Sequence, residues 1–177
     1  MNWGNFRADK ALEVLLYVLS KGCTNMYNVL KVIYFADKNH MKMTGTTIFK
    51  DHYIAMKDGP VPSGAYDMLK AVKRFNDYHH LVRDAIELEE GEEYIFKALR
   101  APNPKLFSNA DYSALDEAIE KYGHMPFGEL KKISHNGIDY RQADENDIMS
   151  FDLFLQSIDD NGDIRIFLED CMEKAVC

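Results

Sequence analysis

The fold is decided by the stretch from Val29 to Arg74, whose sequence is VLKVIYFADKNHMKMTGTTIFKDHYIAMKDGPVPSGAYDMLKAVKR. Its first part places apolar residues at steps of three and four, which predicts an amphipathic helix with one apolar face. Thr44-Gly45 is expected to end this helix, because glycine adopts the left-handed conformation at a helix end without steric cost. The β-branched and aromatic residues between Thr46 and Met56 favour an extended segment.

The segment from Asp58 to Pro62, DGPVP, carries the strongest turn signal in the chain. Asp58 and Gly59 suit a turn, while each proline fixes its own φ and pushes the residue before it out of the α region. We expect a rigid corner here, followed by a helix that Ser63 caps. The apolar side chains of that helix would be Tyr66, Leu69, Val72 and Phe75.

The residues before the deciding stretch predict a helix from Arg7 to Lys21, ended by Gly22, and a second helix that begins near Asn25. Two helices joined by a short turn are also typical of a helix-turn-helix, in which lysines of the second helix would face DNA. The net charge of −8 argues against this interpretation, because a nucleic-acid binder needs a basic face to replace condensed counterions. We therefore expect no direct nucleic-acid binding.

The downstream half of the chain predicts a β-hairpin over residues 81–99 and several short helices. The hairpin tip is rich in glutamate, which suits either a solvated loop that guards a sheet edge or a surface that faces a partner. Ser108 is expected to cap a helix with Asp111 near its N-terminus, where a carboxylate is favourable. Further helices are expected at residues 127–134, 139–144, 147–157 and 163–175.

Together these elements predict a helix-dominated α+β fold with a small antiparallel β-sheet, formed by residues 46–57 and 81–99. A length of 177 residues and an apolar content of 46% suit a single domain over residues 1–177. The three cysteines are odd in number and far apart, which fits a reducing cytoplasm better than a disulfide scaffold. Charges interrupt the apolar run at the N-terminus, so we expect neither a signal peptide nor a membrane span.

Side chains that can perform chemistry do not form a recognisable catalytic or metal motif. The adjacent His79 and His80 would point to opposite faces of a strand and could not easily bind one metal together. Asp37 and His40 lie one helical turn apart, where a local polar pair is favoured over an acid–base couple. The DDNGD loop resembles a calcium loop, but Leu168 occupies the position of the bidentate glutamate. We expect no catalytic residues, no metal and no cofactor.

The deciding stretch also resembles a known family. Residues 33–45, IYFADKNHMKMTG, followed by YIAMK at 53–57 and GPVP at 59–62, are similar to the antitoxin SocA-like domain, also called the Panacea domain. Weaker similarities follow downstream, and the resemblance covers about residues 11–143, with the expected C-terminal helices at 147–175 beyond it. Tyr140 departs from the family pattern, which implies a Trp at that position.

This resemblance implies a bacterial or phage protein that neutralises a cognate protein toxin by direct binding, without enzymatic activity. Family members pair with toxins of several unrelated folds, so the fold of the toxin stays open. An acidic surface would suit a basic toxin, although acidity also simply favours solubility. A second interpretation is an adaptor from a phage or other mobile element that presents a partner to a protease or modulates a host protein. Such an adaptor needs two binding faces, whereas a blocking antitoxin needs one.

The residues that we expect to bind a partner lie in the first helix of the deciding stretch and at its corner. A corner fixed by prolines loses little conformational entropy on binding, which suits a recognition ridge. The alternative is a corner that only holds the extended segment against the next helix. The predicted partner-binding residues are Asp37, His40, Lys57, Pro60, Val61 and Pro62.

Overall fold

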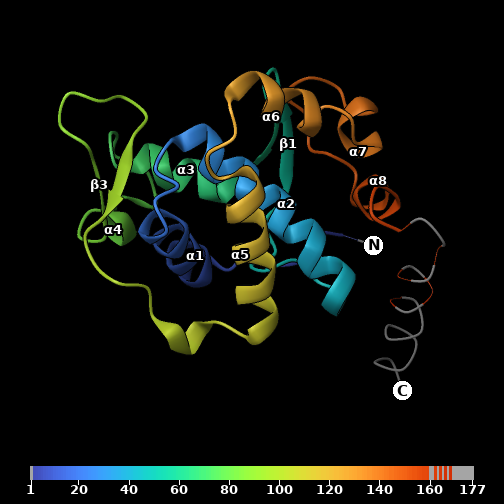
Figure 1. Ribbon diagram of the computed structural model, residues 1–177, viewed down its shortest axis with the longest axis horizontal. Coiled ribbons are helices and arrows are strands. Elements are labelled where there is room, and N and C mark those ends of the chain that lie inside the picture. The colour runs from blue at the N-terminus through green and yellow to red at the C-terminus, as the bar shows by residue number, and fades with distance from the viewer. Residues whose placement is uncertain (1, 160–161, 163, 165, 167, 169–177) are drawn as a thin grey trace.

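The computed structural model describes residues 2–159 and residues 162, 164, 166 and 168. Its architecture is a helix-dominated α+β fold, as predicted, with α2 (Met26–Thr44) running through the middle (Figure 1). A 3-10 turn, η1, spans Pro104–Leu106. The other helices are α1 (Ala8–Ser20), α3 (Ser63–Ala71), α4 (His79–Val82), α5 (Asn109–Tyr122), α6 (Phe127–Ser134), α7 (Ile138–Arg141) and α8 (Phe151–Gln156).

Helix α2 is the element around which the others pack, and it contacts α1, α3, α5, α6 and the strand at residues 59–62. The Asn25 side chain caps its start by accepting a hydrogen bond from the Tyr27 N–H at 2.9 Å. Gly45, with a φ of 75°, ends it. Both boundaries were predictable, because the capping and glycine signals are local. Helix α1 likewise fits the predicted range from Arg7 to Lys21.

The strands form two separate hairpins, so the prediction of one sheet is wrong. Strand β1 (Tyr53–Met56) pairs antiparallel with β2 (Gly59–Pro62), and β3 (Ile86–Leu88) pairs antiparallel with β4 (Phe96–Ala98). Figure 1 shows the hairpin that carries β3 at one edge of the molecule, apart from β1. The GPVP segment, predicted as a corner, is therefore a strand that follows a tight turn.

The two prolines are tolerated in β2 because they lie where no ladder hydrogen bond is needed. The Ala55 N–H and the Tyr53 C=O bond to residues 146–149 on the other side of β1, at 3.0 and 2.8 Å. The backbone groups of Ala55 and Tyr53 therefore point away from β2, and Pro60 and Pro62 lie opposite these two residues. The alternation of the strand thus accounts for both prolines.

The N-terminus of α3 is capped by a distant carboxylate and not, as predicted, by Ser63. Asp51 accepts hydrogen bonds from the N–H groups of Gly64 and Ala65, both at 3.0 Å, and is buried. The Ser63 side chain makes no capping hydrogen bond. A carboxylate is favourable at this position because the start of a helix carries a partial positive charge.

An irregular buried loop connects α2 to β1, where a longer extended segment was predicted. The strand begins only at Tyr53, although Ile48 and Phe49 are already buried. The Ile48 N–H donates to the Asp37 carboxylate at 2.8 Å, and the Phe49 C=O accepts from the Arg7 N–H at 2.9 Å. The backbone of the loop is therefore satisfied by neighbouring elements, without a partner strand.

The later helices follow the predictions where the signals are local. Helix α5 begins with a capping box between Ser108 and Asp111 and buries its predicted apolar face. Helix α6 has the predicted bounds, whereas α7 overlaps the predicted range of residues 139–144 but already ends at Arg141. The helix expected at 147–157 is shortened to α8, because residues 146–149 bond to β1. The helix expected at 163–175 lies largely outside the described residues.

The core has two parts. The larger part packs α1, α2, α3 and α5 together, and the smaller part is aromatic and centres on Tyr34, Tyr53 and Phe154. The ring centroid of Trp3 lies 5.4 Å from that of Tyr53 and 5.0 Å from that of Phe154, distances at which aromatic pairs stabilise beyond their buried area. Among the described residues, no helix is long and apolar enough to cross a membrane.

Candidate functional site

Polar side chains leave α2 at successive turns, and each fastens the helix to another part of the fold. These contacts explain why polar residues recur along a helix that is otherwise buried in the core. The bonded pairs are Asn28 with the carbonyls of Tyr122 and Met125, Lys31 with the carbonyl of Pro60, Tyr34 and Lys38 with the carboxylate of Asp139, Asp37 with Ile48 and Tyr53, and His40 with Asp111.

The carboxylate of Asp111 on α5 is the centre of a buried ion cluster. It accepts hydrogen bonds from Lys10 Nζ at 2.9 and 2.8 Å and from the Ser108 hydroxyl, and His40 Nε2 lies 3.2 Å from it as an ion-pair partner. His40 Nδ1 lies 2.7 Å from the carbonyl oxygen of Thr46, which can only accept. Nδ1 therefore donates to this carbonyl, and the Asp111 carboxylate beside Nε2 favours the protonated ring. One carboxylate thus joins α1, α2 and α5.

Burial and hydrogen bonding act in opposite directions on this cluster. Burial lowers the pKa of His40, but the hydrogen bonds to Asp111 and Thr46 outweigh burial and raise the pKa above 6.5. Burial raises the pKa of Asp111, but the hydrogen bonds from His40 and Lys10 hold that pKa well below its usual range. Because His40 and Asp111 both favour their charged forms, the cluster forms a buried ionic contact between helices of the core.

Asp37 lies in a separate buried site and does not hydrogen-bond to His40, in contrast to the predicted local pair. Its carboxylate accepts from the Ile48 N–H at 2.8 Å and from the Tyr53 hydroxyl at 2.7 Å. Burial raises the pKa of Asp37 to about 6, and these two hydrogen bonds oppose the rise. Asp37 therefore holds the loop after α2 against the aromatic part of the core.

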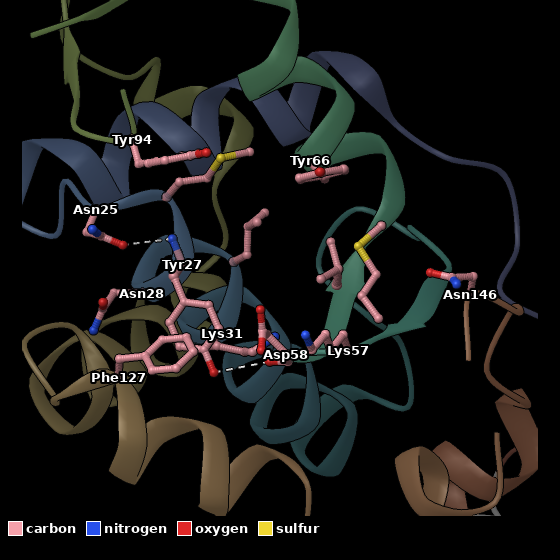
Figure 2. A pocket seen from close by; sticks show the side chains of 14 residues that line it. Asn25, Tyr27, Asn28, Lys31, Lys57, Asp58, Tyr66, Tyr94, Phe127 and Asn146 are labelled. Carbon is pink, nitrogen blue, oxygen red and sulfur yellow. Dashed lines mark hydrogen bonds between the residues drawn. The ribbon is translucent and has the colours of Figure 1, made fainter. Parts of the chain in front are cut away.

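A groove of about 720 Å³ opens beside the N-terminal half of α2 (Figure 2). Residues of the β1–β2 hairpin, α3 and α6 line it together with α2. Its buried lining includes the aliphatic side chains of Met26, Leu30 and Val61, each less than a tenth exposed. The groove thus offers an apolar surface that is open to solvent and lies next to the central helix.

Aromatic side chains from four separate segments border the groove. Figure 2 shows Tyr66 and Tyr94 on one side and Tyr27 and Phe127 on the other. Tyr94 is 56% exposed and Phe127 is 51% exposed, whereas large apolar side chains are usually covered. Phe127 is supported by Tyr27, at 4.6 Å between ring centroids. Exposed aromatics around an apolar surface are typical of a site that a partner covers.

Lys31 lies in the groove wall but hardly reaches solvent, because it is 1% exposed. Its Nζ donates to the Pro60 carbonyl at 2.7 Å and lies 4.9 Å from the ring centroid of Tyr27. Burial lowers the pKa of Lys31 to about 7, and the nearby Asp58 opposes this shift. Lys31 therefore serves to fasten α2 to β2 beneath the groove surface.

The β1–β2 turn forms a rigid wall of the groove. Lys131 Nζ lies 2.7 Å from the Asp58 carboxylate, and the Tyr27 hydroxyl donates to the Asp58 carbonyl at 3.1 Å. Gly59 has a φ of 102°, and a Cβ there would lie 2.7 Å from Ser134 Oγ and 3.2 Å from Lys31 Cε. Only glycine fits this backbone conformation and this close approach without adjustment. The turn is therefore held by α2 and α6 at once.

Tyr140, which stands where the family resemblance implies a Trp, packs behind this turn. Its hydroxyl donates to the Met56 carbonyl at 2.8 Å, and its ring centroid lies 4.3 Å from that of His135. His135 Nε2 is buried without a hydrogen-bond partner among the described residues. Burial lowers the pKa of His135, and the neighbouring Lys131 lowers it further. A tyrosine thus fills this packing position and also anchors β1.

The structure brings the predicted partner-binding residues into three different environments. Asp37 and His40 are buried within the core, and Pro60 and Pro62 are buried in β2. Val61 lines the groove with 7% of its surface exposed, and Lys57 is an exposed lining residue. The GPVP segment is therefore a buried strand beside a groove and not an exposed ridge. Contact of any of the predicted residues with a partner stays a prediction.

Sequence reasoning did not identify three of the four aromatic side chains that border the groove. Tyr27, Tyr94 and Phe127 come from three segments that only the fold brings together, and aromatics at such positions are equally typical of a core. A local signal existed at Tyr94, which follows the glutamate-rich hairpin tip and interrupts its polar character. Within the described part of the chain, no three His, Cys, Asp or Glu side chains gather as metal ligands would.

Comparison with protein families gives a match. The sequence model of the family described as antitoxin SocA-like, Panacea domain, matches residues 29–137, more than half of the chain and a narrower range than the 11–143 expected. The matched range contains β1, β2, α3 and α6, which contribute to the groove. Searches of curated proteins and of solved structures give no match.

Proposed function

Because the chain belongs to the antitoxin SocA-like, Panacea domain family, we propose that it is an antitoxin that neutralises a protein toxin by direct binding and has no enzymatic role. The family match carries this proposal. The groove supports it from the structure, since the matched range of residues 29–137 contributes most of the groove lining.

The groove has the physical properties that direct binding needs. Tyr and Phe side chains supply large contact areas with few rotatable bonds, and such residues often dominate binding energies. The wall at Gly59 is held in place by Lys131 and Tyr27, so little conformational entropy would be lost on binding. A toxin segment seated there would be held by a rigid surface, and the body of the antitoxin would cover the adjoining part of the toxin.

A growth assay tests this function. The product of the reading frame adjacent to the gene is expressed alone and together with this protein, and the complex is examined on a sizing column. We expect growth arrest with the neighbour alone, rescue on co-expression, and a stable complex. A harmless neighbour, or rescue without a complex, would contradict direct neutralisation.

The same assay separates blocking from the adaptor interpretation. Large apolar side chains outside the groove, such as Phe75 at 90% exposure and Ile148 at 62%, are candidate contacts for the second partner that an adaptor needs. An adaptor would lower the amount of the partner over time in cells with an active protease. A blocking antitoxin would leave the amount of toxin unchanged, and we expect this second result.

A further inference from the structure

The groove is bordered by cations although the chain as a whole is acidic, with a net charge of −8. A second hollow of about 310 Å³ shares Met26, Tyr66 and Tyr94 with the groove and so continues it along α3. The exposed cations that line the two hollows are Lys57, Lys73 and Arg74, joined by the half-buried Lys70. The charge of this surface is therefore opposite in sign to that of the whole molecule.

Two of these lysines lie against the aromatic border. Lys73 Nζ is 4.6 Å from the ring centroid of Tyr94, and Lys70 Nζ is 4.8 Å from that of Tyr66. Such cation–π contacts hold an ammonium group beside the ring while it stays accessible. Each ring and its lysine thus present an apolar face and a positive charge to the same occupant.

The carboxylates near the groove compensate Lys70 but leave Lys57, Lys73 and Arg74 without an ion pair within the described part of the chain. Asp58 is engaged by Lys131 at 2.7 Å, and Asp67 lies 3.7 Å from Lys70. Glu92 and Glu93 precede Tyr94 in the exposed hairpin tip but line neither hollow. Among the described residues, the lining of both hollows contains a single carboxylate, Asp58.

We propose that the groove binds an acidic, apolar segment of the protein toxin. Large aliphatic or aromatic side chains of that segment lie on Met26, Leu30 and Val61, and its carboxylates face Lys57 and Lys73. This inference rests on the proposed antitoxin function and specifies the chemistry of its binding site. It also refines the expectation of a basic toxin, because a toxin of any net charge can present an acidic segment.

Two fluorescein-labelled peptides test the chemistry of the groove on the full chain. Both carry leucines at the same positions, with glutamates between them in one peptide and lysines in the other. We expect the glutamate peptide to bind and the lysine peptide to bind at least about tenfold more weakly, since charge complementarity separates them. Binding of the glutamate peptide should weaken as salt is added. Equal binding of the two peptides, stronger binding of the lysine peptide, or no binding of either overturns the inference.

Variants locate the binding on the groove. Replacing both Lys57 and Lys73 with glutamate should lower the affinity for the glutamate peptide about tenfold or more, because each charge reversal turns an attraction into a repulsion. Tyr94→Ser should weaken both peptides, since it removes apolar area without changing charge. Lys121→Glu is the matched control: Lys121 is exposed and lies 5.3 Å from the ring centroid of Tyr122, away from both hollows. Unchanged affinity in the double variant overturns the inference.

The growth assay keeps the two proposals apart. If the wild-type protein rescues growth and binds the toxin, but the double variant does so equally well, the groove inference fails and the antitoxin function stands. If the wild-type protein neither rescues growth nor binds, the antitoxin function fails and the groove inference fails with it. Rescue by the wild-type protein and by Lys121→Glu, with loss in the double variant, supports both.

Discussion

The two halves of helix α2 differ in what surrounds their bonded polar residues. In the C-terminal half, Asp37, Lys38 and His40 are enclosed, and each is bonded to a partner from another element. In the N-terminal half, Tyr27 and Lys31 lie beside an open groove, at whose border the rings of Tyr94 and Phe127 are 56% and 51% exposed. Polar side chains along a helix therefore indicate buried hydrogen bonds and ion pairs within the fold as readily as a binding site. The solvent exposure of the surrounding side chains, which only the fold reveals, distinguishes internal contacts from a binding site.

The largest expected effect on stability comes from breaking the ion cluster around Asp111, which holds the C-terminal half of α2. Asp111→Ala should lower the free energy of unfolding by about 3–5 kcal/mol, because it leaves Lys10 and His40 buried without their counter-charge. Urea unfolding followed by circular dichroism measures the loss. Glu120→Ala, on an exposed position of the same helix, should change stability by less than about 0.5 kcal/mol. Equal stability of the two variants would show that the cluster around Asp111 contributes nothing.

A smaller effect is expected at the wall of the groove. Gly59→Ala should lower the free energy of unfolding by about 1–3 kcal/mol, because the new Cβ meets Ser134 and Lys31 at a positive φ. Gly91→Ala is the matched control, since Gly91 also has a positive φ (82°) but nothing within 4 Å of the added Cβ. Thermal unfolding of both variants isolates the cost of the close approach. A control that is as unstable as Gly59→Ala would mean that the backbone conformation alone accounts for the loss.

The buried half should also respond to pH in a defined direction. His40 has a folded-state pKa above 6.5, so its contribution to stability is complete below that pH and is lost as pH rises through the higher folded value. The stability difference between the wild-type protein and His40→Gln should therefore shrink from mildly acidic to alkaline pH. Urea unfolding across this range measures it, with the exposed His124→Gln as a control. A difference that grows with pH would contradict an imidazolium at this site.

The smallest effect on stability is expected in the open half. Tyr94→Ser removes a side chain that is 56% exposed, so the free energy of unfolding should change by less than about 1 kcal/mol, while toxin binding weakens. Thermal unfolding and a pull-down with the toxin measure the two properties on the same variant. Loss of stability comparable to that of Asp111→Ala would make Tyr94 part of the scaffold.

The sequence predicted those elements whose signals are local. Asn25, Gly45 and the Ser108–Asp111 capping box each act within a few residues, so the starts or ends of α2 and α5 were found. The Asp51 cap on α3 escaped prediction because the carboxylate acts across a loop, and the nearer Ser63 looked suitable. The pairing of β2 with β1 escaped prediction for a similar reason. A strand tolerates proline only at residues that need no ladder hydrogen bond, and the sequence does not show which residues those are.

The candidate site was predictable only in part. The sequence argument from a proline-fixed corner placed Lys57 and Val61 in a binding segment, and the structure puts both in the lining of the groove. It could not show that His40 has its partner elsewhere in the chain, since Asp111 is far away in sequence. The aromatic border needs α2, α6 and the second hairpin to meet, which no local pattern encodes.

Hydroxyl-radical footprinting of the complex with the toxin compares the two halves most directly. Tyr94 and Phe127 border the groove, whereas Phe75 and Met43 are exposed elsewhere, with Met43 near the C-terminal end of α2. All four side chains are accessible to oxidation in the free protein. On complex formation we expect Tyr94 and Phe127 to lose reactivity while Phe75 and Met43 keep it. Protection of Met43 and Phe75, with Tyr94 and Phe127 still reactive, would place the toxin on a different face and contradict the role of the groove.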